Sequence, residues 1–292
     1  KKGAVLLGCP NRFSKDWVVE NYLDLIRDKF NAMVDESIDV QFKVQRRKRT
    51  PSPATLQPHP DQQTLPGMPQ NKRSRNFLLN SQFTFDRFIV GQSNEFAYSA
   101  SKNIALGDPC NYHSLLMLSN TGLGKTHLSQ AIGHTILAQN PQSRVFYMTA
   151  EDFTNEMITS LRTRRIEAFK SRYRRSCDVL LLEEVHFLGG KEKIQTELGY
   201  TLDALAQDHK KIIFTSSLPP KDIPQMSKEL SSRLTSGLVT TIGGPDYHTR
   251  VQILMEKAKE YDVFLSKDVV HFLAGQLKRD VRQMESALKC FK

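Results

Sequence analysis

Residues 115–126 read Leu-Leu-Met-Leu-Ser-Asn-Thr-Gly-Leu-Gly-Lys-Thr. The four apolar residues 115–118 predict a short buried strand, and the stripe of Leu128, Ile132 and Ile136 predicts a helix that begins near Lys125. A glycine-rich turn between a strand and a helix is typical of a phosphate-binding loop, whose template is G-x-x-x-x-G-K-[ST]. Ser119 stands where the template has its first glycine, so the match depends on the Gly-x-Gly-Lys-Thr ending and its context. A chance glycine-rich turn is the alternative interpretation.

Each residue type in this loop has a chemical reason. Gly122 and Gly124 let backbone N–H groups approach phosphate oxygens, because no Cβ stands in the way. The N-terminus of the following helix adds partial positive charge. Lys125 is expected to reach the β- and γ-phosphates of ATP or ADP, and the Thr126 hydroxyl to ligate Mg²⁺. The predicted nucleotide-binding residues of the loop are Asn120, Thr121, Gly122, Leu123, Gly124, Lys125, Thr126 and His127.

A second, acidic element is needed to hold the metal and to position water. The apolar run 179–182 ends in Glu183 and Glu184. We expect Glu183 to join the Mg²⁺ shell together with Thr126, and Glu184 to orient or deprotonate the attacking water. Two adjacent acids after a strand are otherwise a plain loop start.

Strands and helices alternate along the larger part of the chain. Apolar runs predict strands at 115–118, 145–148, 179–182 and 211–215, and helical patterns follow over 125–136, 151–175 and 191–207. Such alternation predicts an α/β fold with a parallel sheet covered on both faces. Beyond Pro245 only helices are expected, as an appendage to that core.

Three further polar positions have two interpretations each. Ser216, at the tip of the last predicted strand with Thr215 and Ser217, is a candidate to sense the γ-phosphate or simply a strand end. Arg233 is a candidate to act on a neighbouring subunit's nucleotide. Arg282 lies one position off its helix's apolar stripe. Spacing alone favours ordinary surface arginines at both positions.

Composition limits the remaining possibilities. No run of 18 apolar residues occurs in the 292 residues, so no membrane span is predicted. Four cysteines without a CxxC pair support neither a disulfide framework nor a zinc site, and they fit a reducing cytosol. The net charge of +10 is concentrated in residues 45–77 and 162–175, each of which has seven basic and one acidic residue. Such runs indicate either a polyanion partner or a solvated face.

The N-terminal part of the chain has a different character. Residues 45–77 hold six of the thirteen prolines and predict a disordered linker. Residues 1–44 predict a small β-α-β piece, with strands at 5–7 and 38–44 and a helix around Trp17. Forty-four residues form a thin core, so we expect this piece to belong to a larger domain.

Together these motifs resemble one family, the DnaA-type bacterial chromosomal replication initiators of the AAA+ ATPases. The likeness extends over nearly the whole chain. It is carried, besides the loop and the acidic pair, by the segments Asn11–Trp17, Phe83–Asn94, Val185–Glu192 and Asp280–Leu288. The resemblance implies four parts: the later half of an N-terminal interaction domain at 1–44, a linker at 45–77, an AAA+ core at 78–244 and a partial helical lid at 245–292.

The resemblance also implies residue roles that spacing does not. Phe88, Ile89 and Val90 would lie near the adenine. Arg233 would be an arginine finger that reads ATP on the adjacent subunit, and Arg282 the second sensor on the lid. The helices of 151–175 would be the insertion that tracks single-stranded DNA, with Ile158, Lys191 and Lys193 in contact with that strand. Implied partners are other copies of the chain, the replicative helicase through the N-terminal domain, and acidic phospholipids, all in the bacterial cytoplasm.

Three departures from the family pattern bear on function. The family usually has glycine at Ser119 and Asp-Asp at Glu183-Glu184, so we expect ATP to bind but hydrolysis to be slow or altered. The family's duplex-reading helix-turn-helix domain should follow Phe291, and the chain has no initiator Met, so we expect a fragment. A helicase-loader ATPase and a basic nucleic-acid tether with a vestigial loop are the alternative functions.

Overall fold

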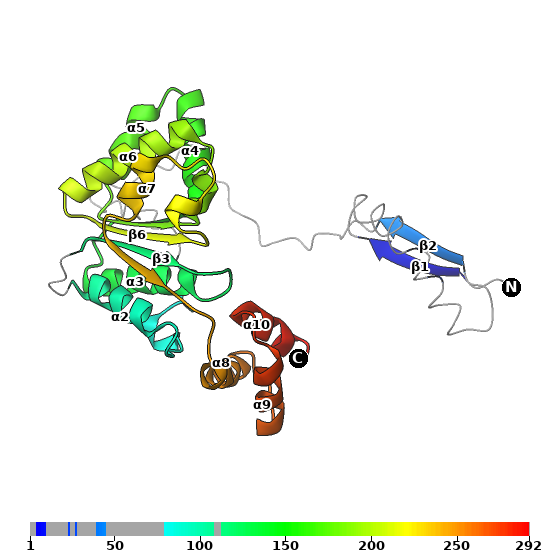
Figure 1. Ribbon diagram of the computed structural model, residues 1–292. Coiled ribbons are helices and arrows are strands. Elements are labelled where there is room, and N and C mark those ends of the chain that lie inside the picture. Colours follow the sequence, from blue (N-terminus) through cyan, green and yellow to red (C-terminus); the bar gives the residue numbers. More distant parts are fainter. Residues whose placement is uncertain are drawn as a thin grey trace, which may run out of the picture. The chain divides into compact units, whose positions relative to one another are not determined.

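The computed structural model describes residues 4–9, 23, 27, 39–44, 79–107 and 112–291. The chain divides into two compact units, Lys1–Gln70 and Asn71–Lys292. Figure 1 shows the elements of each unit. The helix predicted around Trp17 and the linker predicted at 45–77 lie outside the described residues.

The smaller unit contains two described strands. β1 (Ala4–Cys9) and β2 (Asp39–Val44) pair in parallel, from Ala4 opposite Asp39 to Cys9 opposite Val44. Both strands were predicted and are confirmed.

The larger unit is built on a five-stranded sheet in the order β4-β5-β6-β3-β7, with every pair parallel. The strands are β3 (Ser114–Leu118), β4 (Val145–Thr149), β5 (Val179–Glu183), β6 (Lys211–Ser216) and β7 (Leu238–Thr241). The first four confirm the prediction of a parallel sheet. β7 was not predicted, because four residues with two threonines show no clear period. Pairing with β3, where Leu115 lies opposite Leu238, makes it a strand.

Helices cover both faces of this sheet (Figure 1). On one face lie α2 (Glu95–Leu106) and α3 (Lys125–Gln139), and on the other α4 (Ala150–Arg162), α5 (Ile166–Arg175), α6 (Glu192–Gln207) and α7 (Lys228–Leu234). Short 3₁₀ turns are η1 (Phe85–Arg87), η2 (Val185–Leu188) and η3 (Pro220–Asp222). The predicted helices are confirmed; α2 and α7 come in addition.

Alternate strand residues enter the two cores. Leu180 and Leu182 of β5 belong to the cluster under α4–α7, whereas Leu181 packs with α2 and α3. All three are fully buried. A strand whose both faces are covered reads as a continuous apolar run, which is why the pattern of residues 179–182 predicted it correctly.

The appendage after Pro245 consists of α8 (Tyr247–Glu260), α9 (Lys267–Gln276) and α10 (Val281–Lys289). Each begins at a side-chain cap: Asp246, Ser266 and Asp280 accept a hydrogen bond from a backbone N–H of the first turn. The three helices share their own apolar cluster, which includes Leu254, Leu273, Met284 and Leu288. This confirms the predicted helical appendage.

No helix within the described residues is both long and apolar enough to cross a membrane.

Asp178 links the starts of three strands, at the edge of the sheet where the strands begin. Its carboxylate accepts from Arg144 Nε (2.8 Å), Arg144 Nη2 (2.9 Å), the Arg144 backbone N–H (3.0 Å) and Lys210 Nζ (3.0 Å). The side-chain hydrogen bonds from Arg144 hold the pKa of Asp178 well below its usual range, although burial opposes the shift.

We expect Asp178→Asn to lower the free energy of unfolding at pH 7 by about 1–2 kcal/mol, because the partners keep part of their surface in solvent. A depressed folded-state pKa contributes stability above the unfolded pKa and loses it as pH falls through the folded pKa. The deficit of the variant should therefore shrink below about pH 4. Urea unfolding from pH 7 to about pH 3 measures it. Asp208→Asn, at the exposed end of α6, is the control. An equal loss in both variants would contradict the prediction.

Candidate active site

The loop between β3 and α3 has the backbone of a phosphate cradle. Gly122 (φ +82°) and Gly124 (φ +101°) both adopt the left-handed region that favours glycine. A Cβ at Gly124 would lie 2.8 Å from Phe88 Cε2, so this glycine also makes room for an aromatic ring. The loop feeds directly into α3, whose first residue is Lys125. Both glycines are thus favoured by the backbone conformation of the loop, a reason in addition to the close approach of phosphates that the sequence predicted.

Lys125 lies along the loop. Its Nζ donates to the carbonyl oxygens of Ser119 (2.5 Å) and Asn120 (3.0 Å) and to the Ser119 hydroxyl (3.1 Å). Burial lowers the pKa of Lys125, and the nearby carboxylates of Glu183 and Glu184 oppose that shift. Ser119 itself is buried and donates to the Asn120 carbonyl at 2.9 Å. The departure from glycine at Ser119 therefore adds a polar contact to the lysine without disturbing the loop.

Glu183 faces the start of α3. Thr126 Oγ1 donates to Glu183 Oε2 at 2.5 Å, while Glu183 Oε1 is buried and has no hydrogen-bond partner among the residues that the structure describes. Burial raises the pKa of Glu183. The nearby hydroxyls of Thr126 and Ser129 oppose this rise, although Ser129 Oγ is not placed to form a hydrogen bond. A buried carboxylate oxygen without a partner next to a threonine hydroxyl is a fitting pair of ligands for a hard cation such as Mg²⁺.

Glu184 follows β5 in a left-handed conformation (φ +58°) and lines the pocket. Its backbone N–H donates to Thr215 Oγ1 at 3.0 Å, which ties it to the tip of β6. Next to it, His186 Nδ1 accepts from the Ser217 N–H at 3.4 Å. Burial lowers the pKa of His186, which keeps the ring neutral and able to accept. The ends of β5 and β6 are thus linked at the pocket.

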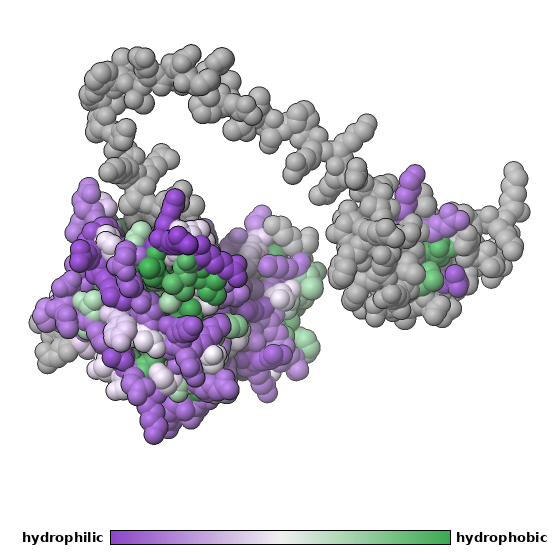
Figure 2. Space-filling model, turned by 90° about the horizontal axis from the view of Figure 1, so that it is seen from above, coloured by the Kyte–Doolittle hydropathy of each residue, from purple (hydrophilic) through white to green (hydrophobic). Residues whose placement is uncertain are grey.

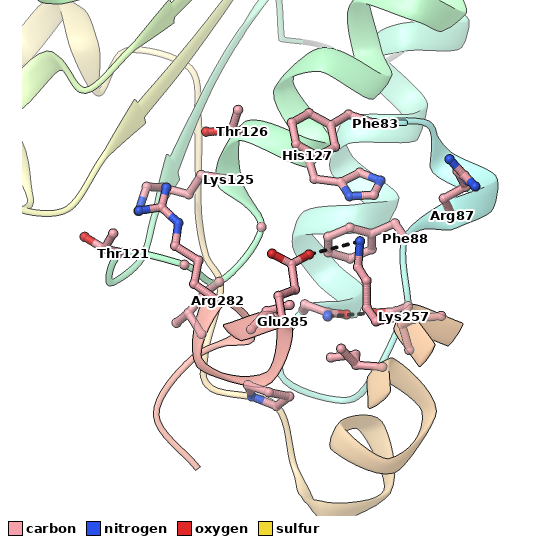
Figure 3. Close-up of a pocket in the computed structure, with 18 of the residues that line it drawn as sticks. Phe83, Arg87, Phe88, Thr121, Lys125, Thr126, His127, Lys257, Arg282 and Glu285 are labelled. Atoms are coloured by element: carbon pink, nitrogen blue, oxygen red, sulfur yellow. Dashed lines mark hydrogen bonds and ion pairs between the residues drawn. The ribbon is translucent and has the colours of Figure 1, made fainter. Parts of the chain in front are cut away.

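The pocket has a volume of about 330 Å³ and extends from the loop to an aromatic end. Figure 3 shows Thr121, Lys125 and Thr126 at one end, and Phe83, Phe88 and His127 at the other. The Phe88 and His127 rings meet edge to face at 5.2 Å, and His127 Nε2 lies 2.7 Å from the Thr84 carbonyl. Burial lowers the pKa of His127. The aromatic end is suited to a flat base and the loop end to phosphates.

The helical appendage closes the pocket. The Val281 N–H donates to the Gly122 carbonyl at 3.1 Å, so α10 begins on the phosphate loop itself. Arg282 follows and lines the pocket beside Lys125 (Figure 3). On α8, Lys257 pairs with Glu260 (2.9 Å) and with Glu285 of α10 (3.1 Å). The lid therefore contributes cations and acids to the site.

The structure places most of the predicted site residues at the pocket and some of them away from it. Seven of the eight loop residues, Phe88, Ile89, Glu183, Glu184 and Arg282 adjoin one another at the pocket. Asn120, the eighth, is exposed and contributes its carbonyl to Lys125. Val90 and Ser216 also lie outside the pocket lining. Val90 is 38% exposed, and Ser216 is fully buried with its hydroxyl bonded to Leu218, so the neighbouring Ser217 is the serine at the pocket.

Arg233 also lies away from the pocket. It sits on α7, where Nε and Nη2 donate to the two oxygens of Asp203 at 2.7 and 2.9 Å. It does not line the pocket of its own chain. A role at a nucleotide therefore requires a second subunit.

The residues that were predicted to contact DNA lie on adjoining elements. Ile158 of α4 is 36% exposed, and α4 contacts η2. Lys191 caps α6 and donates to the Phe187 carbonyl of η2 at 2.6 Å, while Lys193 is exposed in the first turn of α6. The face of the larger unit seen from above in Figure 2, which is the side of α4–α7, is mostly hydrophilic and carries a hydrophobic patch.

The structure divides the basic run of residues 162–175. Lys170, Arg172 and Arg174 form ion pairs with Glu167, Glu156 and Glu197. The arginines at 162, 164, 165 and 175 are exposed, and no ion pair is found for them within the described part of the chain. The cationic surface is therefore narrower than the composition indicated.

Sequence reasoning missed most of the lid side of the pocket. The additional lining residues include Phe83, Arg87, Asn94, His186, Ser217, Glu256, Lys257, Glu260 and Glu285. The three at 256, 257 and 260 are charged residues of an ordinary surface helix pattern, which carries no signal of a site. Ser217 was one of three polar candidates at the strand end, and only its position past the buried end of β6 distinguishes it.

Two family models match this chain. The family model described as the bacterial DnaA ATPase domain matches residues 79–241, and that of the DnaA N-terminal domain matches residues 1–32. The chromosomal replication initiator protein DnaA of Desulfatibacillum aliphaticivorans is 42% identical over 287 residues. That alignment covers 98% of this chain but 63% of the relative, so the chain spans less than two thirds of its length.

Two solved structures confirm the fold. Domain III of the Thermotoga maritima replication initiation protein DnaA matches with a TM-score of 0.70 and 34% identity, covering 73% of this chain and 88% of that one. A replication initiator DnaA bound to AMPPCP and single-stranded DNA matches with a TM-score of 0.67 and 35% identity, covering 73% and 65%. The resemblance seen in the motifs is thereby confirmed: the chain belongs to the DnaA family of bacterial chromosomal replication initiators and carries its AAA+ ATPase domain.

Proposed function

We propose that this chain binds and slowly hydrolyses ATP, assembles with copies of itself at a replication origin, and engages single-stranded DNA as the duplex is opened. The observation that carries the proposal is the distribution of its charged groups. Lys125, Arg282 and two carboxylates share one pocket, whereas Arg233 is on a surface away from it. A subunit that needs a neighbour's arginine can use ATP as a signal for assembly.

The pocket suggests how its residues act on ATP. Lys125 and the loop N–H groups would bind the phosphates, and Phe88 with His127 would flank the base. Glu184 would orient the attacking water, since its backbone is held by Thr215 at the phosphate end. Thr126 and Glu183 would hold Mg²⁺, which when bound neutralises charge on the phosphate oxygens. Glu183 is longer than an aspartate, which supports slow hydrolysis.

Single-stranded DNA would lie along Ile158, Lys191 and Lys193. An exposed apolar side chain beside two cations suits a strand whose bases are unstacked and whose phosphates are accessible. The related structure bound to AMPPCP and single-stranded DNA supports this partner. Each phosphate contact should add about −0.7 to the slope of log K against log salt.

Further partners follow from family membership. We infer that residues 1–44 contact the replicative helicase, because residues 1–32 match the family's N-terminal domain. Residues 45–77 would act as a linker, 78–244 as the ATPase core and 245–292 as a partial lid. Reading of duplex origin boxes would need a helix-turn-helix domain beyond Phe291. Acidic phospholipids are a further candidate partner, and the bacterial cytoplasm, at the nucleoid, is the proposed location.

Arg233→Ala tests the proposal. In sedimentation velocity, we expect ATP to promote assembly and single-strand binding more than ADP in the wild type, and the variant to lose this difference. The physical reason is that alanine removes the cation that would distinguish a triphosphate across the interface. ATP affinity of the monomer should not change, because Arg233 is outside the pocket.

Lys221→Ala, which removes an exposed cation of η3 away from the predicted DNA contacts, is the control and should keep the preference for ATP. Equal assembly of the wild type with ATP and with ADP would refute the proposal.

A further inference from the structure

The guanidinium of Arg233 is held by a two-pronged ion pair. Nε donates to Asp203 Oδ1 at 2.7 Å and Nη2 to Asp203 Oδ2 at 2.9 Å. Such paired, parallel hydrogen bonds restrict an arginine more than a single contact does. Asp203 lies in α6, and Arg233 lies in α7, whose neighbouring Leu230 and Leu234 are buried. The backbone of both partners is therefore anchored, and the pair constrains the side chain alone.

The third nitrogen also faces the same helix. A Cβ built on Gly199 would lie 3.3 Å from Arg233 Nη1 and 3.5 Å from Cζ. The absence of a side chain at Gly199 thus lets the guanidinium lie flat against α6. In this position Nε and Nη2 are occupied by Asp203, and Nη1 is turned toward Gly199.

This arrangement opposes the role proposed for Arg233. An arginine that reads the phosphates of a neighbour must direct N–H groups outward, whereas here Nε and Nη2 each donate to Asp203 of the same subunit. We infer that Asp203 is a positioning residue that restrains Arg233 against α6, so that the ATP of an incoming subunit has to displace the aspartate. The inference rests on the proposed function, because it assumes that Arg233 acts across the interface.

The strength of the pair is compatible with such displacement. The side chains of Arg233 and Asp203 are 34% and 43% exposed, so solvent screens their attraction. A triphosphate carries more negative charge than one carboxylate and can compete for the cation. Asp203 would therefore raise the protein concentration at which ATP drives assembly, without preventing it.

Asp203→Asn tests the restraint, because asparagine keeps the size and removes the charge. We expect the protein concentration for half-maximal assembly with ATP to fall about two- to fivefold, the range that a partly exposed ion pair supports. With ADP it should not change. ATP affinity of the monomer, measured by titration calorimetry, should also stay the same, since Asp203 does not line the pocket. In the Arg233→Ala background the effect should vanish.

Two further variants make the test specific. Asp208→Asn removes an exposed carboxylate at the end of the same helix and should leave assembly unchanged. Gly199→Ala adds a methyl group next to Nη1 and should shift assembly in the same direction as Asp203→Asn, while the better helix propensity of alanine preserves folding. Thermal unfolding checks the fold of each variant.

The possible outcomes distinguish the restraint by Asp203 from the interface role of Arg233. An unchanged or higher assembly concentration in Asp203→Asn overturns the restraint, and so does an equal change with ADP. If Arg233→Ala keeps the wild-type preference for ATP, the interface role of Arg233 fails instead. A lower concentration with ATP alone, lost in the double variant, supports the inference.

Discussion

Lys125→Ala is expected to weaken ATP binding by about 30-fold or more, since removing a desolvated cation from bound phosphates typically costs about 2–5 kcal/mol. The half-buried ammonium lies on the phosphate loop, where it donates to the carbonyl oxygens of Ser119 and Asn120. Titration calorimetry with ATP and with ADP measures the loss. Assembly that depends on ATP should disappear at the same nucleotide concentrations.

The control is Lys221→Ala, which removes an exposed lysine of η3 and should leave ATP affinity unchanged. A Lys125→Ala protein that binds ATP within a few-fold of the wild type would show that the loop does not hold the phosphates. It would also favour the alternative of a basic tether with a vestigial loop.

Glu184→Gln should reduce the hydrolysis rate by about 100-fold or more, the usual effect of losing a general base. ATP affinity should be nearly unchanged, because the amide keeps the size of the side chain and the phosphate contacts of the loop remain. Single-turnover hydrolysis, measured at saturating ATP and Mg²⁺, separates the two effects. The variant should still assemble with ATP and should keep the assembled state for longer.

Glu183→Gln distinguishes the two carboxylates. It should raise the Mg²⁺ concentration needed for half-maximal hydrolysis, because Glu183 Oε1 is the oxygen suited to the cation. Glu151→Gln, in the exposed first turn of α4, should have the wild-type rate. If Glu184→Gln hydrolyses ATP as fast as Glu151→Gln, another group activates the water. An unaffected Mg²⁺ requirement in Glu183→Gln would remove the metal role of that residue.

The lid illustrates what local patterns cannot show. Spacing in the sequence places Arg282 off the apolar stripe of its helix and says nothing more. The fold brings it to the pocket, because α10 begins on the loop through the bond from Val281 to Gly122. The same holds for Lys257 and Glu260. In the sequence they resemble an ordinary pair of exposed charges on a helix, and only the packing of α8 beside the base-binding end of the pocket brings them to the site. A contact between residues far apart in the chain leaves no period in either segment.

The strand ends show the same limit on a smaller scale. A run of polar residues after β6 identifies three candidates, and the exact point where the strand leaves the sheet separates Ser216 from Ser217. Val90 was grouped with Phe88 and Ile89, and yet it is exposed and does not line the pocket.

From the residues alone, the phosphate loop, the acidic strand end and the parallel sheet can be predicted, because each depends on short-range spacing: glycines where the backbone needs them, and apolar runs where strands are buried. The family was indicated by the resemblance of several motifs in order along the chain. The folded chain was needed for β7, the lid side of the pocket and the pair of Asp203 with Arg233. Thirty residues separate that aspartate from its arginine. Only the packing of α7 on α6 brings them together, because side-chain contacts of this kind arise from the geometry of the whole core.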